Sequence, residues 1–229
     1  MLNKLHDLFV RILTWVNRNR KYKSNQEVTK VNLGAGLKVA PGWYNIDGHL
    51  RAFFSTWPEF VLRWIYRMTQ KSRFYYTEKE YCQILRSNRF IHHDLKYGIP
   101  FYEASVDFLY CSHLLEHLHR DEAVRLVKEA YRVLKPGGVF RICVPDLAYA
   151  VSLYQKGKKV EALRYFFCET KADYYTYHRY LYDFELLKDL LLSQGFSKVE
   201  RCEYQKGRTP DIELLDNRPE ETLYVEAIK

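Results

Sequence analysis

Glycines and short polar side chains follow five separate apolar runs of the sequence, where together they could bind a ligand. These residues are Gly34, Ala35 and Gly36; Asp47; Asp94; Cys111, Ser112 and His113; and Asp146. Each run is short and rich in β-branched or aromatic residues, which is typical of a buried strand. The carboxyl ends of parallel strands meet at one edge of a sheet, so we expect these residues to form one site there.

The glycine turn at residues 34–36 could bring the backbone close to a ligand, because glycine has no Cβ to obstruct the approach. The turn differs from a dinucleotide-binding fingerprint, because Val39 replaces the third glycine and Asp47 follows Gly34 by only 13 residues. That fingerprint has its acidic residue about 20 residues on, so a nicotinamide enzyme is disfavoured. The Asp47 carboxylate suits the two hydroxyls of a ribose, and a turn-forming Asp before Gly48 explains it equally well.

Two histidines are candidates for a general base. His113 comes just after the fourth expected strand, and His178 lies in a tyrosine-rich segment. An imidazole titrates near neutral pH and can take a proton from a hydroxyl group. We take His113 as the first candidate and His178 as the second, with local hydrogen bonding as the alternative role for either.

Residues 113–117 also spell H-x-x-E-H, the signature of the inverted zinc proteases. On a helix this spacing would place His113 and His117 on one face. A protease needs the motif inside a long helix with a further ligand downstream, and here the motif follows a buried strand. His and Glu can bind a divalent metal, but the sequence offers no complete ligand set. We therefore predict no metal site, with a divalent metal kept as an alternative.

The elements that must position these residues alternate between strands and helices. Strands are expected at residues 28–33, 43–46, 89–92, 106–110, 139–144, 197–204 and 222–228. Helices are expected at residues 2–17, 56–68, 78–86, 121–134 and 184–192. Thr56 and Glu59 have the spacing of a capping box, and Pro136-Gly137-Gly138 should end the helix before residue 139. This alternation predicts a doubly wound α/β fold, a mostly parallel seven-stranded sheet with helices on both faces.

The chain divides into an N-terminal segment and one larger domain. Residues 1–27 are expected to form an amphipathic helix and a linker, and residues 28–229 the domain, with a helical insertion at 50–86. A tyrosine-rich segment at 149–182 could close over a ligand as a lid or form an aromatic helical cover. The two basic amphipathic helices, 2–17 and 56–68, either lie on a membrane surface or pack on the domain.

Composition narrows the class of protein and of partner. The 229 residues are 47% hydrophobic, which suits a folded domain, and the net charge of +8 favours acidic partners without choosing among them. The five cysteines form no C-x-x-C pair, and we expect reduced thiols. No apolar run is long enough to cross a membrane, and residues 1–20 do not read as a signal peptide. We expect a cytoplasmic protein, with contact to the inner face of the membrane as an option.

Several motifs together resemble those of class I methyltransferases that use S-adenosylmethionine (SAM). Residues 31–36, V-N-L-G-A-G, resemble the SAM loop of that family. Residues 93–95 and 99–107 are similar to its D-x-x-x-L-P-F and S-F-D stretch, and residues 114–118 look like its L-E-H segment. Residues 129–138, E-A-Y-R-V-L-K-P-G-G, are the most specific match. The resemblance is to the type-11 subgroup, which is often associated with surface-polysaccharide synthesis.

The resemblance implies a Rossmann-like methyltransferase fold with an antiparallel last strand, SAM as cofactor, and a role for each matched residue. Gly34, Ala35 and Gly36 would pass under the methionine part of SAM, and Asp47 would hold the ribose hydroxyls. Asp94 and Leu95 would flank the adenine. Cys111 and Ser112 would lie near the methionine end.

The resemblance also implies O-methylation of a glycan or glycan-lipid precursor. An RNA methyltransferase is the first alternative, because the charge favours it, but no RNA-binding module is recognisable, so nucleic acid is the weaker partner. A non-catalytic SAM-fold partner or membrane-adaptor protein is the second. The sequence names neither the acceptor nor the oligomeric state.

Overall fold

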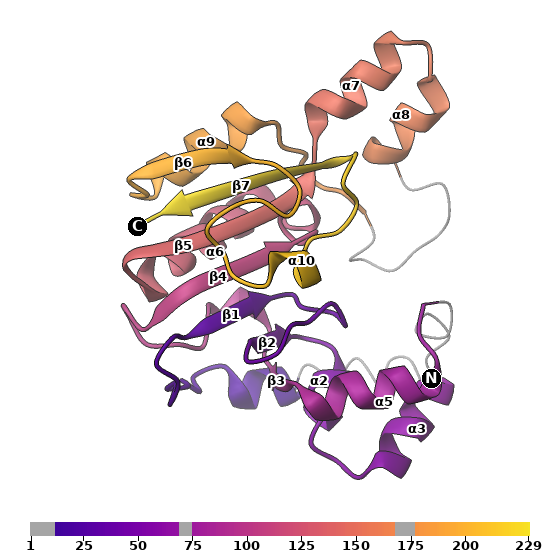
Figure 1. Cartoon of the computed structure of the whole chain (residues 1–229), viewed down its shortest axis with the longest axis vertical. Helices are drawn as coiled ribbons and strands as arrows, with labels where there is room; N and C mark the ends of the chain where they lie inside the picture. The colour runs from indigo at the N-terminus through magenta and orange to yellow at the C-terminus, as the bar shows by residue number, and fades with distance from the viewer. Residues whose placement is uncertain (1–11, 69–74, 168–176) are drawn as a thin grey trace.

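The computed structural model describes residues 12–68, 75–167 and 177–229, and these build a seven-stranded sheet of order β3-β2-β1-β4-β5-β7-β6 (Figure 1). The strands are β1 Lys30–Leu33, β2 Tyr44–Asp47, β3 Arg89–His92, β4 Val106–Ser112, β5 Leu134–Pro145, β6 Lys198–Cys202 and β7 Thr222–Ile228. Strands β1 to β5 pair in parallel, and β7 runs antiparallel to both β5 and β6. The expected doubly wound, Rossmann-like methyltransferase fold with an antiparallel last strand is confirmed.

The strand register aligns the carboxyl ends of the parallel strands. Leu33, near the end of β1, pairs with Ile46 of β2 and with Cys111 of β4. Asp47 at the end of β2 pairs with His92 at the end of β3. The loops that follow these strands therefore leave the sheet at one level, which is the edge where open α/β sheets bind ligands.

Helices cover the two faces of the sheet unequally. They are α2 Leu50–Phe54, α3 Glu59–Met68, α5 Glu78–Ser87, α6 Arg120–Val133, α7 Leu147–Gln155, α8 Lys159–Phe166, α9 Phe184–Ser193 and α10 Ile212–Leu215, with short 3₁₀ turns η1 Leu95–Tyr97 and η2 Leu115–His117. Helices α6 and α9 pack against one face through the main apolar core, and the short α10 lies over the other (Figure 1). Helices α3 and α5 form a third cluster beside β3.

The chain between β1 and β2 forms no helix. The Asn32 amide closes this connection, because it donates to the carbonyl of Lys38 at 3.0 Å and to the Asn45 side chain at 3.2 Å. The buried amide pair thus holds the glycine turn in place of a first helix.

Two helix boundaries differ from the sequence-based expectation. Helix α3 begins at Glu59, so Thr56 is not its cap, and the Glu59 carboxylate instead accepts from Arg63 on the same helix. A reciprocal capping box does occur, at Thr77 and Glu80 at the start of α5. Helix α6 ends at Val133 and strand β5 begins at Leu134, so no loop separates them. The strand was expected only from residue 139.

Gly138 makes this direct connection from helix to strand feasible. A Cβ at Gly138 would come within 2.9 Å of the Lys135 carbonyl oxygen and 3.1 Å of the Asp107 carbonyl oxygen. Only glycine fits between these two backbones. The Pro-Gly-Gly run therefore lies inside β5 as an irregular stretch, with Gly137 at φ +77° and a shift in the register with β4.

The remaining expected segments are partly described. Residues 12–17 are helical, and the rest of the helix expected at 2–17 lies outside the described residues. The tyrosine-rich segment contains α7 and α8, which extend beyond the carboxyl end of β5 and the amino end of β7 (Figure 1), and residues 168–176 lie outside the described part. Within the described residues, no helix is long and apolar enough to cross a membrane.

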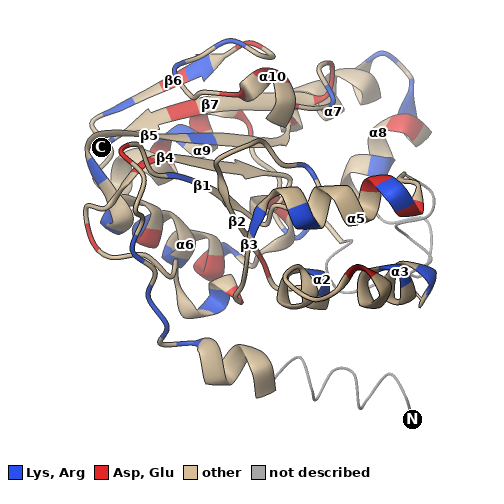
Figure 2. Ribbon diagram, turned by 60° about the horizontal axis from the view of Figure 1, so that its bottom comes forward, with Lys and Arg blue, Asp and Glu red and all other residues tan. Residues whose placement is uncertain are grey.

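Helix α3 turns part of its expected apolar stripe toward solvent. Leu62 is buried, whereas the exposed fractions of Phe60, Trp64 and Met68 are 72%, 62% and 67%. Lys and Arg alternate with acidic residues along α3 and α5 (Figure 2). Only some of the apolar side chains of α3 therefore pack on the domain.

Candidate active site

Backbone hydrogen bonds tie the loops after β1, β2 and β3 to one another. The Ala35 N–H donates to the Ile46 carbonyl at 3.0 Å, and the His93 N–H donates to the Asp47 carbonyl at 3.2 Å. The glycine turn, Asp47 and Asp94 consequently gather at the carboxyl edge of the sheet. The sequence-based expectation about their location is met for these three stretches.

The glycine turn presents open backbone at this edge. Gly34 and Gly36 have φ values of +64° and +57°, a left-handed conformation that other residues adopt at a cost. A Cβ on Gly34 would touch the Leu114 side chain at 3.1 Å, whereas a Cβ on Gly36 would meet nothing within 4 Å. The free space beside Gly36 is compatible with a ligand lying against the main chain.

The Asp47 carboxylate is buried and already holds two groups. Its Oδ1 accepts from the His49 N–H at 2.7 Å, and its Oδ2 accepts from Arg51 Nη2 at 3.0 Å. A carboxylate offers about four acceptor positions, so it can still receive hydroxyl groups. Helix α2 places Arg51 here, four residues after Asp47, in a pairing that we did not predict from the sequence. The turn-forming role weighed for Asp47 is therefore real and compatible with ligand binding.

Asp94 and Leu95 form the rim beside β3. The Asp94 carboxylate caps η1 by accepting from the Lys96 N–H at 3.0 Å, and Lys96 Nζ lies 2.9 Å from its other oxygen. Leu95 packs against the main core. The neighbouring His92 and His93 are buried, and burial lowers the pKa of both imidazoles, so they are neutral in the folded protein at pH 7.

Cys111 and Ser112, at the end of β4, differ in what they could offer a ligand. The Cys111 thiol is fully buried in the main core, and burial raises its pKa well above the ordinary value, so the thiol is neutral. Its side chain cannot reach a ligand at this edge, and only its main chain is available there. The Ser112 hydroxyl is buried and interacts with the Tyr110 phenol, so its contact with a ligand stays a prediction.

His113 has a strained backbone and an ordered side chain. Its φ of +50° lies in the left-handed region, and its N–H donates to the Cys143 carbonyl at 2.9 Å. Its Nδ1 lies 3.2 Å from the Glu116 carboxylate, and its Nε2 lies 3.4 Å from the Thr222 hydroxyl. Glu116 is fully buried, so the imidazole is oriented by a carboxylate that solvent does not screen.

His117 and His178 lie next to this pair. Their ring centroids are 5.2 Å apart, and His117 Nε2 lies 3.8 Å from the nearer Glu116 oxygen. Burial lowers the pKa of His117. The helix that the protease signature requires is absent: η2 covers only three residues, and His113 precedes it. The sequence did not indicate that Glu116 lies beside both candidate bases, His113 and His178, because His178 is 62 positions further along the chain.

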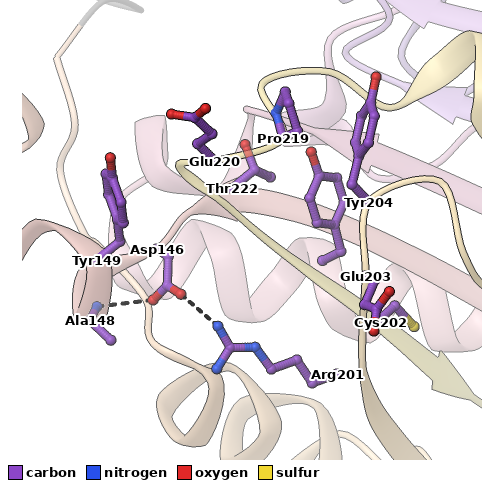
Figure 3. A pocket seen from close by; sticks show the side chains of 11 residues that line it. Asp146, Ala148, Tyr149, Arg201, Cys202, Glu203, Tyr204, Pro219, Glu220 and Thr222 are labelled. Carbon is purple, nitrogen blue, oxygen red and sulfur yellow. Dashed lines mark hydrogen bonds and ion pairs between the residues drawn. The ribbon is translucent and has the colours of Figure 1, made fainter.

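A cavity of about 540 Å³ opens at the ends of β5, β6 and β7 (Figure 3). Its lining includes Asp146, Tyr149, Arg201, Tyr204, Glu220, Thr222 and Tyr224. The Asp146 carboxylate caps α7 at the Ala148 N–H, 2.9 Å away, and pairs with Arg201 at 2.9 Å. Thr222 joins the cavity to His113. The cavity therefore lies on the far side of His113 from the glycine turn.

Comparisons with known proteins bear on what this edge does. A family model described as a methyltransferase domain matches residues 59–142, which include Asp94, His113 and the run ending at Gly138. These residues form a SAM-dependent methyltransferase domain. The family implies SAM as the methyl donor, and the open backbone at Gly36 fits such a ligand.

Solved structures show the same fold at low sequence identity. A SAM-dependent methyltransferase from Thermotoga maritima is 14% identical with a TM-score of 0.50, over 100% of this chain and 96% of that one. The SAM-dependent methyltransferase SibL is 18% identical with a TM-score of 0.51, over 89% of this chain and 51% of that one. No curated protein matches the sequence.

Proposed function

We propose that this methyltransferase transfers the methyl group of SAM to a hydroxyl oxygen of a glycan or glycan-lipid precursor, with His113 as the general base. The observation that carries the proposal is the His113–Glu116 pair, whose second ring nitrogen faces Thr222 at the cavity. This arrangement is suited to a hydroxyl acceptor, because a neutral hydroxyl must lose its proton as the methyl group arrives.

The glycine turn and the neighbouring strand ends would hold SAM, which supplies an electrophilic methyl group on a good leaving group. Gly34 and Gly36 would lie under its methionine part, with the Ser112 hydroxyl as a polar contact. Asp47 would accept from the ribose hydroxyls, and Asp94 and Leu95 would flank the adenine. The rigid loops then orient the acceptor in line with the methyl group, and orientation supplies much of the rate enhancement.

The side chains around His113 determine which of its ring nitrogens carries the proton. The buried Glu116 carboxylate accepts from Nδ1, which leaves the lone pair on Nε2, toward Thr222 and the cavity. An acceptor hydroxyl that replaces the Thr222 contact would give its proton to Nε2. The Glu116 carboxylate would then stabilise the positive charge on the ring.

The cavity supports a polyhydroxylated acceptor. It combines the aromatic rings of Tyr149 and Tyr204 with the carboxylates of Asp146 and Glu220 (Figure 3). Rings with polar tips and carboxylate acceptors are suited to the apolar faces and hydroxyl groups of sugars. The net charge of +8 favours a glycan carrying phosphate, as lipid-linked precursors do. An RNA acceptor is the rival that the same charge favours.

The acceptor class can be tested by incubating the full-length protein with SAM labelled on its methyl group and fractionated cell extract. We expect label in a polysaccharide or lipid-extractable fraction, in a form resistant to nuclease and protease. Label that nuclease releases would replace the glycan with RNA. Tight SAM binding without label in any fraction would favour a non-catalytic partner protein.

Replacing Asp47 with alanine is expected to weaken SAM binding about 10- to 100-fold, because hydrogen bonds to a charged group contribute about 1.5–3 kcal/mol. Isothermal titration calorimetry of the purified protein with SAM measures the change. Asp121→Ala is the matched control, since that carboxylate is exposed and pairs only with Arg125 on the surface of α6 among the described residues. Unchanged affinity in Asp47→Ala would remove Asp47 from the cofactor site.

A further inference from the structure

We infer that Glu116, His117 and His178 bind a divalent transition-metal ion of the Zn²⁺, Mn²⁺ or Co²⁺ type beside the proposed base. One ligand atom from each residue lies within 4.8 Å of the others. Ligand atoms about 2.0–2.2 Å from one ion lie up to about 4.4 Å apart, so the three side chains need only a small closing movement. Two imidazoles and one carboxylate are a donor set that such ions prefer over Mg²⁺ or Ca²⁺.

Both imidazoles are held by hydrogen bonds to the backbone. His117 Nδ1 lies 3.1 Å from the Tyr177 carbonyl, and His178 Nδ1 lies 2.6 Å from the Tyr165 carbonyl. A carbonyl oxygen only accepts, so each Nδ1 carries the proton and each Nε2 carries a lone pair. Metal-binding histidines are commonly fixed in this way, by a carbonyl on the ring nitrogen that does not bind the ion.

The Glu116 carboxylate is left incompletely satisfied by the protein. Its Oε1 faces His113 and His117, whereas its buried Oε2 has no hydrogen-bond partner among the described residues. A fully buried carboxylate oxygen without a partner is costly. A cation in the cluster would supply the missing interaction, which neutral imidazoles cannot supply in full.

The backbone fixes the two halves of the cluster relative to each other. Glu116 and His117 follow β4, and His178 comes from the segment that precedes β6 by about twenty residues. The Arg179 N–H donates to the Glu116 carbonyl at 2.6 Å. The ligands are therefore brought together by main-chain contact, which gives a site built before any ion arrives.

Three protein ligands leave coordination positions open, as in sites where a metal binds substrate. On the proposed function, an open position next to His113 would receive an oxygen of the acceptor, and the ion would orient two neighbouring sugar hydroxyls. Without that function the same cluster would still bind the ion.

The experiment is a Co²⁺ titration of full-length protein that has been treated with a chelator and dialysed. We expect one equivalent to bind and to produce visible absorption bands of low-symmetry Co²⁺, with Zn²⁺ displacing it. Glu116→Gln and His178→Ala should each weaken Co²⁺ binding by more than about 100-fold. Loss of a residue that only supports a ligand costs about 10- to 100-fold. The control is His119→Ala, two residues from His117 and exposed.

Circular dichroism and SAM titration of the same samples keep the outcomes separate. If Glu116→Gln does not fold, His178→Ala decides alone, because His178 lies in a non-helical segment. No Co²⁺ binding by the wild-type protein, or equal binding by the folded variants, would overturn the metal site. If the wild-type protein does not bind SAM, the proposed function is contradicted, whereas the metal result stands.

Discussion

Replacing His113 with asparagine is expected to lower the rate of methyl transfer by about 10²- to 10⁴-fold, the usual contribution of a general base, while SAM affinity stays nearly unchanged. Asparagine tolerates the left-handed conformation better than most residues, so the backbone at φ +50° is kept while the basic nitrogen is lost. Single-turnover transfer with saturating SAM measures the chemical step, and calorimetry measures the affinity.

Two comparisons make the His113 result specific. His113→Ala should lose as much activity as His113→Asn and be somewhat less stable, because alanine adopts a positive φ at a greater cost. His119→Ala should transfer methyl groups at the wild-type rate. Transfer that survives in His113→Asn would exclude His113 as the base, and a parallel fall in SAM affinity would instead place His113 in cofactor binding.

The fold and the cofactor edge could be predicted because both depend on local patterns. Apolar runs of strand length alternate with helical periodicity, and the parallel sheet that follows must align the strand ends. Gly34, Asp47 and Asp94 therefore reach one edge whatever the details of packing. The bounds of the short helices α2, α7 and α8 were not predicted, and α10 was missed, because each covers at most a few turns, for which periodicity is a weak signal.

The acceptor side could not be predicted in the same way, because its contacts join residues far apart in the sequence. Glu116 meets His178, and His113 meets Thr222, through tertiary packing that no spacing rule encodes. The H-x-x-E-H motif would place its two histidines on one face of a helix, but here it follows a buried strand, as expected: β4 ends at Ser112 and His113 turns sharply. A motif whose residue types are right can thus act through a geometry different from its usual one.

Arg141, inside the core, is another residue whose partners could not be predicted from the sequence. It interrupts the apolar run of β5, and the sequence alone offers no partner nearby. In the fold its guanidinium donates to Asp216 through Nη2 at 2.6 Å and Nε at 3.0 Å, and Nη1 lies 3.2 Å from Glu226. The arginine also donates to the carbonyls of Glu203 and Lys206, so it fastens the loop before α10 to the sheet.

Replacing Arg141 with methionine is accordingly expected to reduce the free energy of unfolding by about 3–5 kcal/mol. Neither Arg141 nor Asp216 is exposed at all, and burial opposes the charge while hydrogen bonding to Asp216 raises the pKa of Arg141 above its usual value. Methionine fills most of the space but leaves the Asp216 and Glu226 carboxylates buried without their cation. Urea unfolding followed by circular dichroism at pH 7 measures the loss.

The matched control is Arg125→Met, which removes an ion pair of the same chemistry from the surface of α6. Both partners there are more than half exposed, at 62% and 68%, so water replaces the lost contact and the change should stay within about 0.5 kcal/mol. An equal loss in the two variants would mean that the Arg141 pair is solvated in solution. The loop before α10 would then be held by its apolar contacts, with Leu215 against Trp43 and Tyr224, instead of by the buried charge.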